Sequence, residues 1–166
     1  MDSNDRPAAD PMHGYYLEDL EIGMSAIYGR TIAEGDVSLF AGLCGDDNPL
    51  HVHAEFASRS RFEGRVVHGA HTASLISAVL GTRMPGPGAI YLSQNSRFRA
   101  PVRIGDTVNV LATVTGIDRG KNQATIATVC SVGETVVIDG EATVWVPSRP
   151  RQGAEAGGNG DGRKRV

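Results

Sequence analysis

The chain has 166 residues, a length typical of one domain with a hydrophobic core of its own. Sixteen basic and 19 acidic side chains give a formal net charge of −3, so no overall positive field attracts nucleic acid or an anionic membrane surface. The composition therefore predicts one domain that binds neither nucleic acid nor membrane.

The sequence also predicts where the protein works. No stretch approaches the roughly 18 to 20 apolar residues of a membrane span, and the first ten residues lack the apolar core of a signal peptide. Cys44 and Cys130 fall in apolar surroundings without metal-site spacing, which predicts free, buried thiols in a reducing compartment. We therefore expect a cytoplasmic protein.

Both ends differ in composition from the middle of the chain. Residues 1–13 are polar and include two prolines, whereas residues 148–166 are rich in Gly and Arg. Such segments cannot bury enough apolar surface to fold, so we expect disordered tails around a domain at 14–147.

The first predicted elements are a strand over 24–32 and a helix over 35–45. Asp36 stands near the helix start, Gly45 can end the helix, and Pro49 cannot continue it. The apolar residues at helical spacing are Val37, Leu39, Phe40 and Leu43. The sequence therefore leaves residues 46–51 on a loop that follows a helix.

A short helical patch over 54–60 precedes a longer helix over 70–80, which opens after Gly69 and stops at Gly81. The longer helix is apolar almost all round, with only Ser and Thr as polar members. Such a helix is expected inside a protein rather than on its surface.

The remaining segments predict strands over 90–100, 106–117, 122–132 and 135–146. Their short links imply antiparallel pairing of successive strands. In the last strand one apolar face is expected to be buried, formed by Val136, Ile138, Ala142, Val144 and Val146. The pattern predicts an α+β hot-dog domain, with an antiparallel sheet wrapped around one central buried helix. Such a sheet leaves edge strands and site walls incomplete, which predicts a homodimer or a dimer of dimers.

Asp46 and His51 are the residues on which a catalytic prediction depends. They lie five positions apart on a loop stiffened by Asn48 and Pro49, so a carboxylate and an imidazole can be aimed at one point. Such a pair can take a proton from water and return one to carbon. Asp-Asp-Asn-Pro is also an ordinary turn sequence, so spacing alone leaves a structural role open.

The segment FAGLCGDDNPLH, which starts at Phe40, resembles the signature of the MaoC-like, (R)-specific enoyl-CoA hydratases, Gly-Asp-x-Asn-Pro-aliphatic-His. The likeness continues through FEGRVVHGAHTASLIS and GPGAIYLSQNSRFRAPVRIGDTV, and covers roughly residues 15–146. The residues that match the signature are Gly45, Asp46, Asn48, Pro49, Leu50 and His51.

The resemblance implies roles for individual residues. Asp46 and His51 would activate the water that attacks the β-carbon and return a proton to the α-carbon, while Asn48 would order the loop. The backbone N–H of Gly69 would bind the thioester oxygen, where negative charge develops during attack. Ser77 matches a serine near the catalytic Asp, although a serine that only fills space in the helix is an alternative.

Three further histidines, His53, His68 and His71, lie outside the matched signature. His68 precedes Gly69 as in the family, and a structural, hydrogen-bonded histidine is the preferred interpretation. His53 and His71 depart from the usual family residues. We expect His53 to lie outside the chemistry and His71 to face the acyl channel, where it would influence which chains fit.

Arg97, Arg99 and Arg103 alternate along one strand or follow it. Arg97 and Arg99 are predicted to bind substrate, because guanidinium groups can meet the phosphates of coenzyme A or of a carrier's phosphopantetheine. Charges that alternate on an exposed strand are also often simply solvated.

The resemblance thus implies a hydro-lyase that adds water reversibly to a trans-2-enoyl-CoA and forms the (R)-3-hydroxyacyl-CoA. No metal or cofactor is expected, because the sequence has no cluster to bind one. A hot-dog acyl-CoA thioesterase and a non-catalytic acyl-thioester binding module remain alternatives, since fold alone excludes neither.

Overall fold

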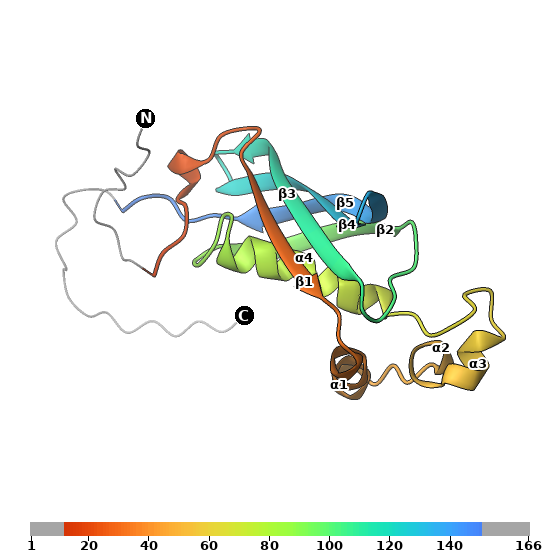
Figure 1. Cartoon of the computed structure of the whole chain (residues 1–166). Coiled ribbons are helices and arrows are strands. Elements are labelled where there is room, and N and C mark those ends of the chain that lie inside the picture. Colours follow the sequence, from red (N-terminus) through yellow and green to blue (C-terminus); the bar gives the residue numbers. More distant parts are fainter. Residues whose placement is uncertain (1–11, 151–166) are drawn as a thin grey trace, which may run out of the picture.

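The computed structural model describes residues 12–150 (Figure 1). None of the helices in this range is long and apolar enough to cross a membrane. The helical elements are η1 (Leu17–Asp19), α1 (Glu34–Cys44), α2 (Pro49–Val52), α3 (Ala54–Ser58) and α4 (Gly69–Thr82). The strands are β1 (Ser25–Thr31), β2 (Ile90–Phe98), β3 (Thr107–Asp118), β4 (Gln123–Val132) and β5 (Thr135–Trp145).

The five strands form one antiparallel sheet in the order β1-β3-β4-β5-β2. Burial alternates along β3 and β4, as expected for strands with one face against a core. Cys130 illustrates the register, because it lies opposite Val110 on β3 and Ile138 on β5. The predicted antiparallel α+β domain is therefore confirmed.

The position of β2 differs from the prediction, since β2 pairs with β5 rather than with its successor β3. A turn does form at residues 103–106, where Asp106 N–H donates to Arg103 O at 3.1 Å, but it does not join β2 and β3 into a hairpin. Within residues 99–106, Val102 O accepts from Val67 N–H at 2.8 Å, and Gly105 N–H donates to Ile32 O at 2.8 Å. These bonds hold the connection against other segments, so β2 becomes an edge strand with one neighbour.

The long helix α4 lies against one face of the sheet (Figure 1) and contacts β1, β2, β3 and β4. Its buried side is mostly apolar and includes Leu75, Ile76, Val79 and Leu80, with Thr72 and His71 buried in its first turn. The prediction of burial all round is wrong for the single chain. A second side is exposed, because the one sheet covers only one face, and its residues are Ala70, Ser74, Ser77 and Gly81.

A bulge in β5 corrects another prediction. The register shifts between Cys130 and Ser131, so that Ser131 pairs with Val136 and Cys130 pairs with Ile138. The extra residue, Val137, is buried beside Ile138, and Val136 is 41% exposed on the opposite face. Strict alternation fails here because a bulge places one additional residue in one strand.

Helices α1, α2 and α3 form a segment that extends away from the sheet (Figure 1). As predicted, α1 ends at Gly45, whose φ of +79° is the left-handed conformation that glycine adopts without strain. Leu39 and Leu43 on α1 are 74% and 82% exposed, because the sheet does not reach them. Cys44 is also exposed, which corrects its predicted burial, whereas Cys130 is buried and both thiols are free.

Residues on both sides of the predicted domain at 14–147 contact the domain. The ring of His13 stacks on Tyr16 with centroids 4.2 Å apart, and Arg149 forms an ion pair with Asp19. The parts of the predicted tails at 1–11 and 151–166 lie outside the described residues.

Candidate active site

The segment from Asp46 to His51 joins α1 to α2 and takes its shape from local hydrogen bonds. Asn48 Oδ1 accepts from Leu50 N–H at 3.1 Å and caps α2, while Pro49 occupies the first helical position. Asp46 Oδ1 accepts from Asn48 N–H at 3.3 Å. The motif therefore places His51 on a one-turn helix rather than on a loop, and Asp46 just before it.

His51 is held by the segment that leads into α4. Its Nδ1 lies 2.8 Å from Val66 O, and Val66 N–H donates to Leu50 O at 3.1 Å. A carbonyl oxygen can only accept, so Nδ1 carries the proton. In the neutral ring the lone pair is then on Nε2, which leaves that atom able to take a proton from water.

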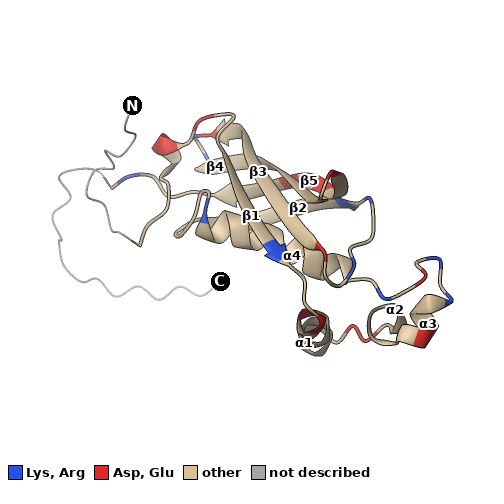
Figure 2. Ribbon diagram, viewed as in Figure 1, with Lys and Arg blue, Asp and Glu red and all other residues tan. Residues whose placement is uncertain are grey.

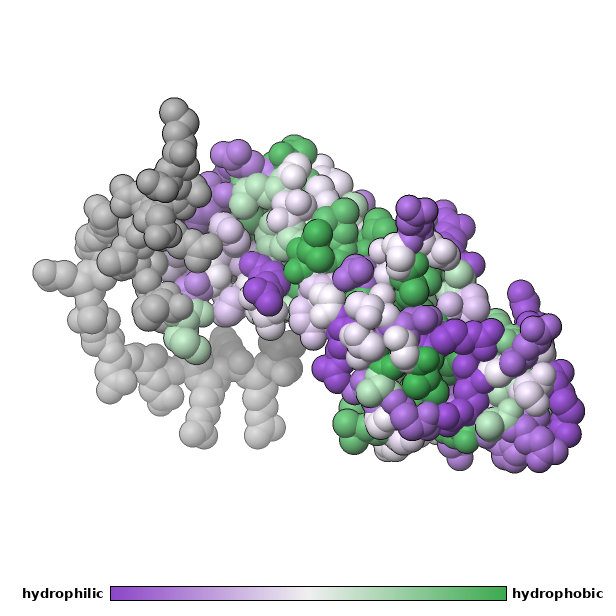
Figure 3. Space-filling model, in the orientation of Figure 1, coloured by the Kyte–Doolittle hydropathy of each residue, from purple (hydrophilic) through white to green (hydrophobic). Residues whose placement is uncertain are grey.

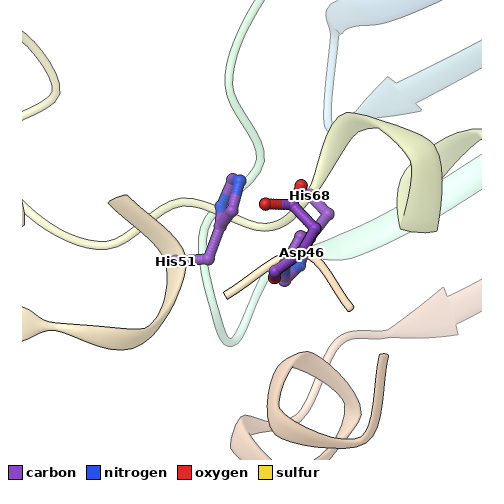
Figure 4. A group of neighbouring side chains, drawn as sticks. All are labelled: Asp46, His51 and His68. Atoms are coloured by element: carbon purple, nitrogen blue, oxygen red, sulfur yellow. The ribbon is translucent and has the colours of Figure 1, made fainter. Parts of the chain in front are cut away.

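Asp46, His51 and His68 come together from three segments (Figure 4). One polar side-chain atom from each lies within 4.8 Å of the others. Two such atoms can both contact one water, since each hydrogen bond spans about 2.8 Å. The sequence-predicted carboxylate and imidazole thus converge, and they are joined by a histidine predicted to be structural.

Gly69 is the first residue of the 14-residue helix α4 and directly follows His68. The first N–H groups of an α-helix have no partner within the helix, and the helix dipole gives them partial positive charge. A Cβ at this position would meet Phe98 Cε1 at 2.8 Å, so a larger residue would crowd the N–H. The arrangement can hold a carbonyl oxygen that gains negative charge.

A cleft of about 320 Å³ adjoins these groups and is mostly apolar. Its volume falls at the lower end of the range of small-molecule sites. Its lining residues are His51, Arg61, Phe62, Val66, Val67, Gly69, Thr72, Phe98, Arg99, Ala100, Pro101, Val102 and Ile138. The cleft therefore connects the imidazole and the helix N-terminus with an apolar surface and two guanidinium groups.

The predicted substrate-binding arginines differ in surroundings. Arg99 lines the cleft and forms a two-bond pair with Asp139, at 2.9 Å for both bonds, which lowers the pKa of that carboxyl group. Arg97 is exposed on β2 opposite Asp139. Arg103 instead donates to the backbone oxygens of Phe62 and Arg65. These contacts give Arg103 a structural function.

Arg61 is a cleft residue that the sequence analysis missed. It is exposed in the connection between α3 and α4, and its Cζ lies 5.4 Å from the centre of the Phe62 ring. Figure 2 shows basic residues along this connection and along the one that follows β2. The cluster Arg59-Ser60-Arg61 is visible in the sequence, but its proximity to β2 depends on the fold.

His71 lies in the first turn of α4 and is buried. Its ring stacks on Phe40 with centroids 5.0 Å apart, and it is absent from the described lining of the cleft. Burial lowers the pKa of His71, and the nearby Asp36 carboxylate partly opposes this effect. The contact between α1 and α4 therefore favours the neutral imidazole.

The two remaining predicted positions lie away from the cleft. Ser77 is on the exposed side of α4, eight residues after Gly69, which corresponds to about 12 Å of helix. Its catalytic support stays a prediction. His53 Nδ1 accepts from Phe56 N–H at 3.1 Å and caps α3, which is a local structural task.

Comparisons with known proteins identify the family of this chain. Residues 20–136 match the model of the "MaoC like domain" family. The chain is 52% identical over 142 residues to an (R)-specific enoyl-CoA hydratase of Rhodospirillum rubrum, covering 86% of this chain and 99% of the relative. It is 50% identical over 148 residues to a 3-hydroxybutyryl-CoA dehydratase of Methylorubrum extorquens, covering 89% and 94%.

Among solved structures, the unliganded R-hydratase PhaJ1 of Pseudomonas aeruginosa superposes with a TM-score of 0.78 at 39% identity. That match covers 82% of this chain and 88% of the hydratase. Sequence, fold and the converging residues lead to one assignment: this chain is a member of the MaoC-like domain family.

Proposed function

We propose that this protein is an (R)-specific enoyl-CoA hydratase, which adds water reversibly to a trans-2-enoyl-CoA. The observation that carries the proposal is the meeting of Asp46 and His51, with Gly69 N–H on the same cleft as His51. The hydratase and dehydratase names of relatives at 50% identity or more support the same reaction class.

The reaction uses the site as follows. Asp46 and His51 Nε2 hold one water, and an O–H bond of the water breaks as its proton passes to the Asp46–His51 pair and its oxygen bonds to the β-carbon. The π electrons of the double bond move toward the thioester oxygen, where Gly69 N–H stabilises the negative charge. The α-carbon then receives a proton from the Asp46–His51 pair, which returns the enzyme to its starting state.

The direct test is an assay on crotonyl-CoA with chiral analysis of the product. Loss of the enoyl absorbance without free thiol, together with the (R)-3-hydroxy product, supports hydration. Release of free thiol would instead identify a thioesterase, and absence of any turnover would leave a binding module.

For the substrate, we propose that Arg61 and Arg99 bind the phosphate-bearing end of coenzyme A, because both line the cleft that contains Gly69. Guanidinium groups match phosphate geometry. Arg97 lies opposite Asp139 on the same strand as the cleft residue Phe98, so we propose that it is a further contact for these phosphates. His71 does not line the cleft. We therefore propose that it affects the acyl site only indirectly, through the contact of its ring with Phe40 of α1.

We propose that the reaction needs no metal or other cofactor, because activated water and a charge-stabilising N–H suffice for hydration. The cluster of Asp46, His51 and His68 has the ligand types of a metal site, so the point requires a test. Prolonged treatment with a chelator should leave kcat unchanged. A loss that added Zn²⁺ or another divalent ion restores would contradict the proposal.

We further propose a homodimer formed through the edge strand β2. The exposed apolar residues of this strand are Ile90, Tyr91, Leu92 and Phe98, and α1 adds Leu39 and Leu43. Figure 3 shows hydrophobic residues at the surface over both the sheet and the α1–α3 segment. An edge strand with apolar side chains is a natural pairing site for a second copy.

Light scattering should give twice the mass of one chain, or four times that mass if dimers pair. Leu92→Lys, which charges the β2 edge, should shift the protein to monomer and lower activity. Ile22→Lys is the matched control, since Ile22 is 71% exposed in a turn outside β2. A monomeric, fully active wild type would contradict the dimer.

The free thiols of Cys44 and Cys130 support a cytoplasmic location, which cell fractionation tests.

A further inference from the structure

His68 occupies the point where the catalytic segments meet. It is 1% exposed, caps α4 and immediately precedes Gly69. Its backbone oxygen accepts from Thr72 N–H at 3.1 Å and from Thr72 Oγ1 at 3.3 Å, which fixes the first turn of the helix. The side chain is therefore anchored beside the N–H proposed to hold the thioester oxygen.

The ring of His68 is bonded to the main chain of the catalytic acid. Nε2 lies 2.9 Å from Asp46 O, and because this oxygen only accepts, Nε2 carries the proton. Nδ1 is buried without a partner among the described residues.

The same ring also contacts the catalytic base. The rings of His68 and His51 (Figure 4) stack with centroids 3.8 Å apart and planes 30° apart. The centroid of the Phe40 ring lies 5.2 Å from that of His68. One side chain thus limits both the position of the Asp46 backbone and the tilt of the His51 ring. Asp46 itself lies on an exposed segment, where few packing contacts would otherwise hold it.

We infer that His68 is a positioning residue of the hydration reaction. Its Nε2–H bond to Asp46 O is the contact that aligns Asp46 with His51 and Gly69, so that one water faces the bound thioester. This inference rests on the proposed function. A displacement of about 1 Å of a reacting group can cost about 10² in rate, so a loss of this bond should lower kcat.

Three substitutions of His68 separate the contribution of its Nε2–H hydrogen bond from that of its aromatic ring. Gln reaches the position of the imidazole Nε2 with an N–H donor, whereas Asn reaches only the position of Nδ1. Phe keeps the aromatic contact without the donor. His68→Gln should retain kcat for crotonyl-CoA within about threefold, and His68→Asn and His68→Phe should lose about 10- to 100-fold with KM within about twofold.

The matched control is His53→Asn, because His53, like His68, is the N-cap residue of a helix, but it lies in the α1–α3 segment away from the cleft. Its kcat should stay at the wild-type value. Thermal unfolding of every variant shows whether a loss of activity follows from a loss of fold. If His68→Phe does not fold, the comparison of Gln with Asn carries the test, since both are polar and differ in reach.

Equal kcat for His68→Gln and His68→Asn in folded proteins would overturn the inference, as would a change confined to KM. A wild-type protein that hydrates crotonyl-CoA while the His68 variants behave alike leaves the proposed function intact and removes only the positioning role. A wild-type protein that does not hydrate any enoyl-CoA overturns both.

Discussion

Asp46 and Asp47 are adjacent acidic residues with different surroundings. Asp46 bonds to Asn48 N–H and belongs to the cluster with His51 and His68, whereas Asp47 is an exposed neighbour outside that cluster. The pair allows the catalytic assignment to be tested with a control one residue away.

Asp46→Asn should lower kcat for crotonyl-CoA by about 10² or more with a smaller effect on KM, because general acid–base catalysis contributes about 10² to 10⁴. The amide keeps the shape of the carboxylate but cannot accept a proton. Asp47→Asn should retain wild-type kcat. Steady-state kinetics of the two variants checks the prediction, and equal values of kcat would remove Asp46 from the mechanism.

Two substitutions at Gly69 separate the contribution of its N–H group from that of its missing side chain. Gly69→Ala adds a Cβ that would meet Phe98 but keeps the N–H. Gly69→Pro adds a similar carbon and removes the N–H, at the first helical position, where proline is tolerated. His68 has a ψ of 131°, which suits a residue before proline.

Gly69→Pro should therefore show about 10² to 10³ lower kcat than Gly69→Ala, the usual loss for one oxyanion donor. Single-turnover kinetics on both variants, with thermal unfolding as a check of the fold, measures the difference. If the two variants have the same kcat, the N–H does not hold the thioester oxygen.

At the scale of elements, the contact between α1 and α4 contains a buried titratable group. His71 packs against Phe40, and the charged or titratable groups that act on it are Asp36, Arg30 and His68. Burial lowers the pKa of His71 below its ordinary value of 6.5. As pH falls, the unfolded chain takes up this proton before the folded chain does.

The stability that His71 contributes is therefore complete above about pH 6.5 and is lost as pH falls from there through the lowered folded pKa. His71→Leu, which does not titrate, should lose less stability than the wild type between about pH 7 and about pH 5. Urea unfolding at both pH values checks this. Equal losses would show that His71 is not held neutral by burial.

The connection between α3 and α4 supplies a second element-level prediction through Arg61. Arg61→Gln should raise KM for crotonyl-CoA about three- to tenfold, which corresponds to roughly 1 kcal/mol at an exposed site. The KM for the crotonyl thioester of N-acetylcysteamine, which has no phosphates, should not change.

Arg59→Gln is the matched control, because Arg59 pairs with Glu55 on the surface and does not line the described cleft. Its KM for both substrates should equal the wild-type value. A similar increase for both substrates in Arg61→Gln would show that Arg61 does not recognise phosphate.

Much of the fold could be predicted from the sequence because its determinants are local. Apolar periodicity located every strand and α4, and Gly45 marked the end of α1 through its left-handed conformation. The pairing of β2 with β5, the bulge at Val137 and the exposure of Cys44 depend on contacts between distant segments. No local pattern records such contacts.

For the site as well, local motifs could be read from the sequence, whereas contacts between distant segments could not. Spacing and resemblance predicted a site at Asp46, His51 and Gly69, which lie in contiguous motifs, and the fold brings Asp46 close to His51 and places His51 and Gly69 on one cleft. Arg61 was missed because it approaches β2 only in three dimensions, and His68 was assigned a purely structural role because its ring contact with His51 crosses 17 residues. Both require the folded chain.

At the scale of the whole molecule, the proposed catalytic pair of Asp46 and His51 lies on the segment that extends from the sheet, while Gly69 begins the helix that packs against the sheet (Figure 1). Asp46 and His51 are neighbours, so they act on a bound enoyl group from one side. The hydroxyl group and the returned proton should therefore be added to the same face of the double bond.

Hydration of crotonyl-CoA in D₂O tests this central claim most directly. NMR of the isolated 3-hydroxybutyryl product gives the relative configuration of the deuterium at the α-carbon and the hydroxyl at the β-carbon. We predict syn addition, with both new groups on one face. Anti addition, or random placement of deuterium in an enzyme that does not exchange product, would contradict the account of one carboxylate–imidazole pair that handles both the water and the proton.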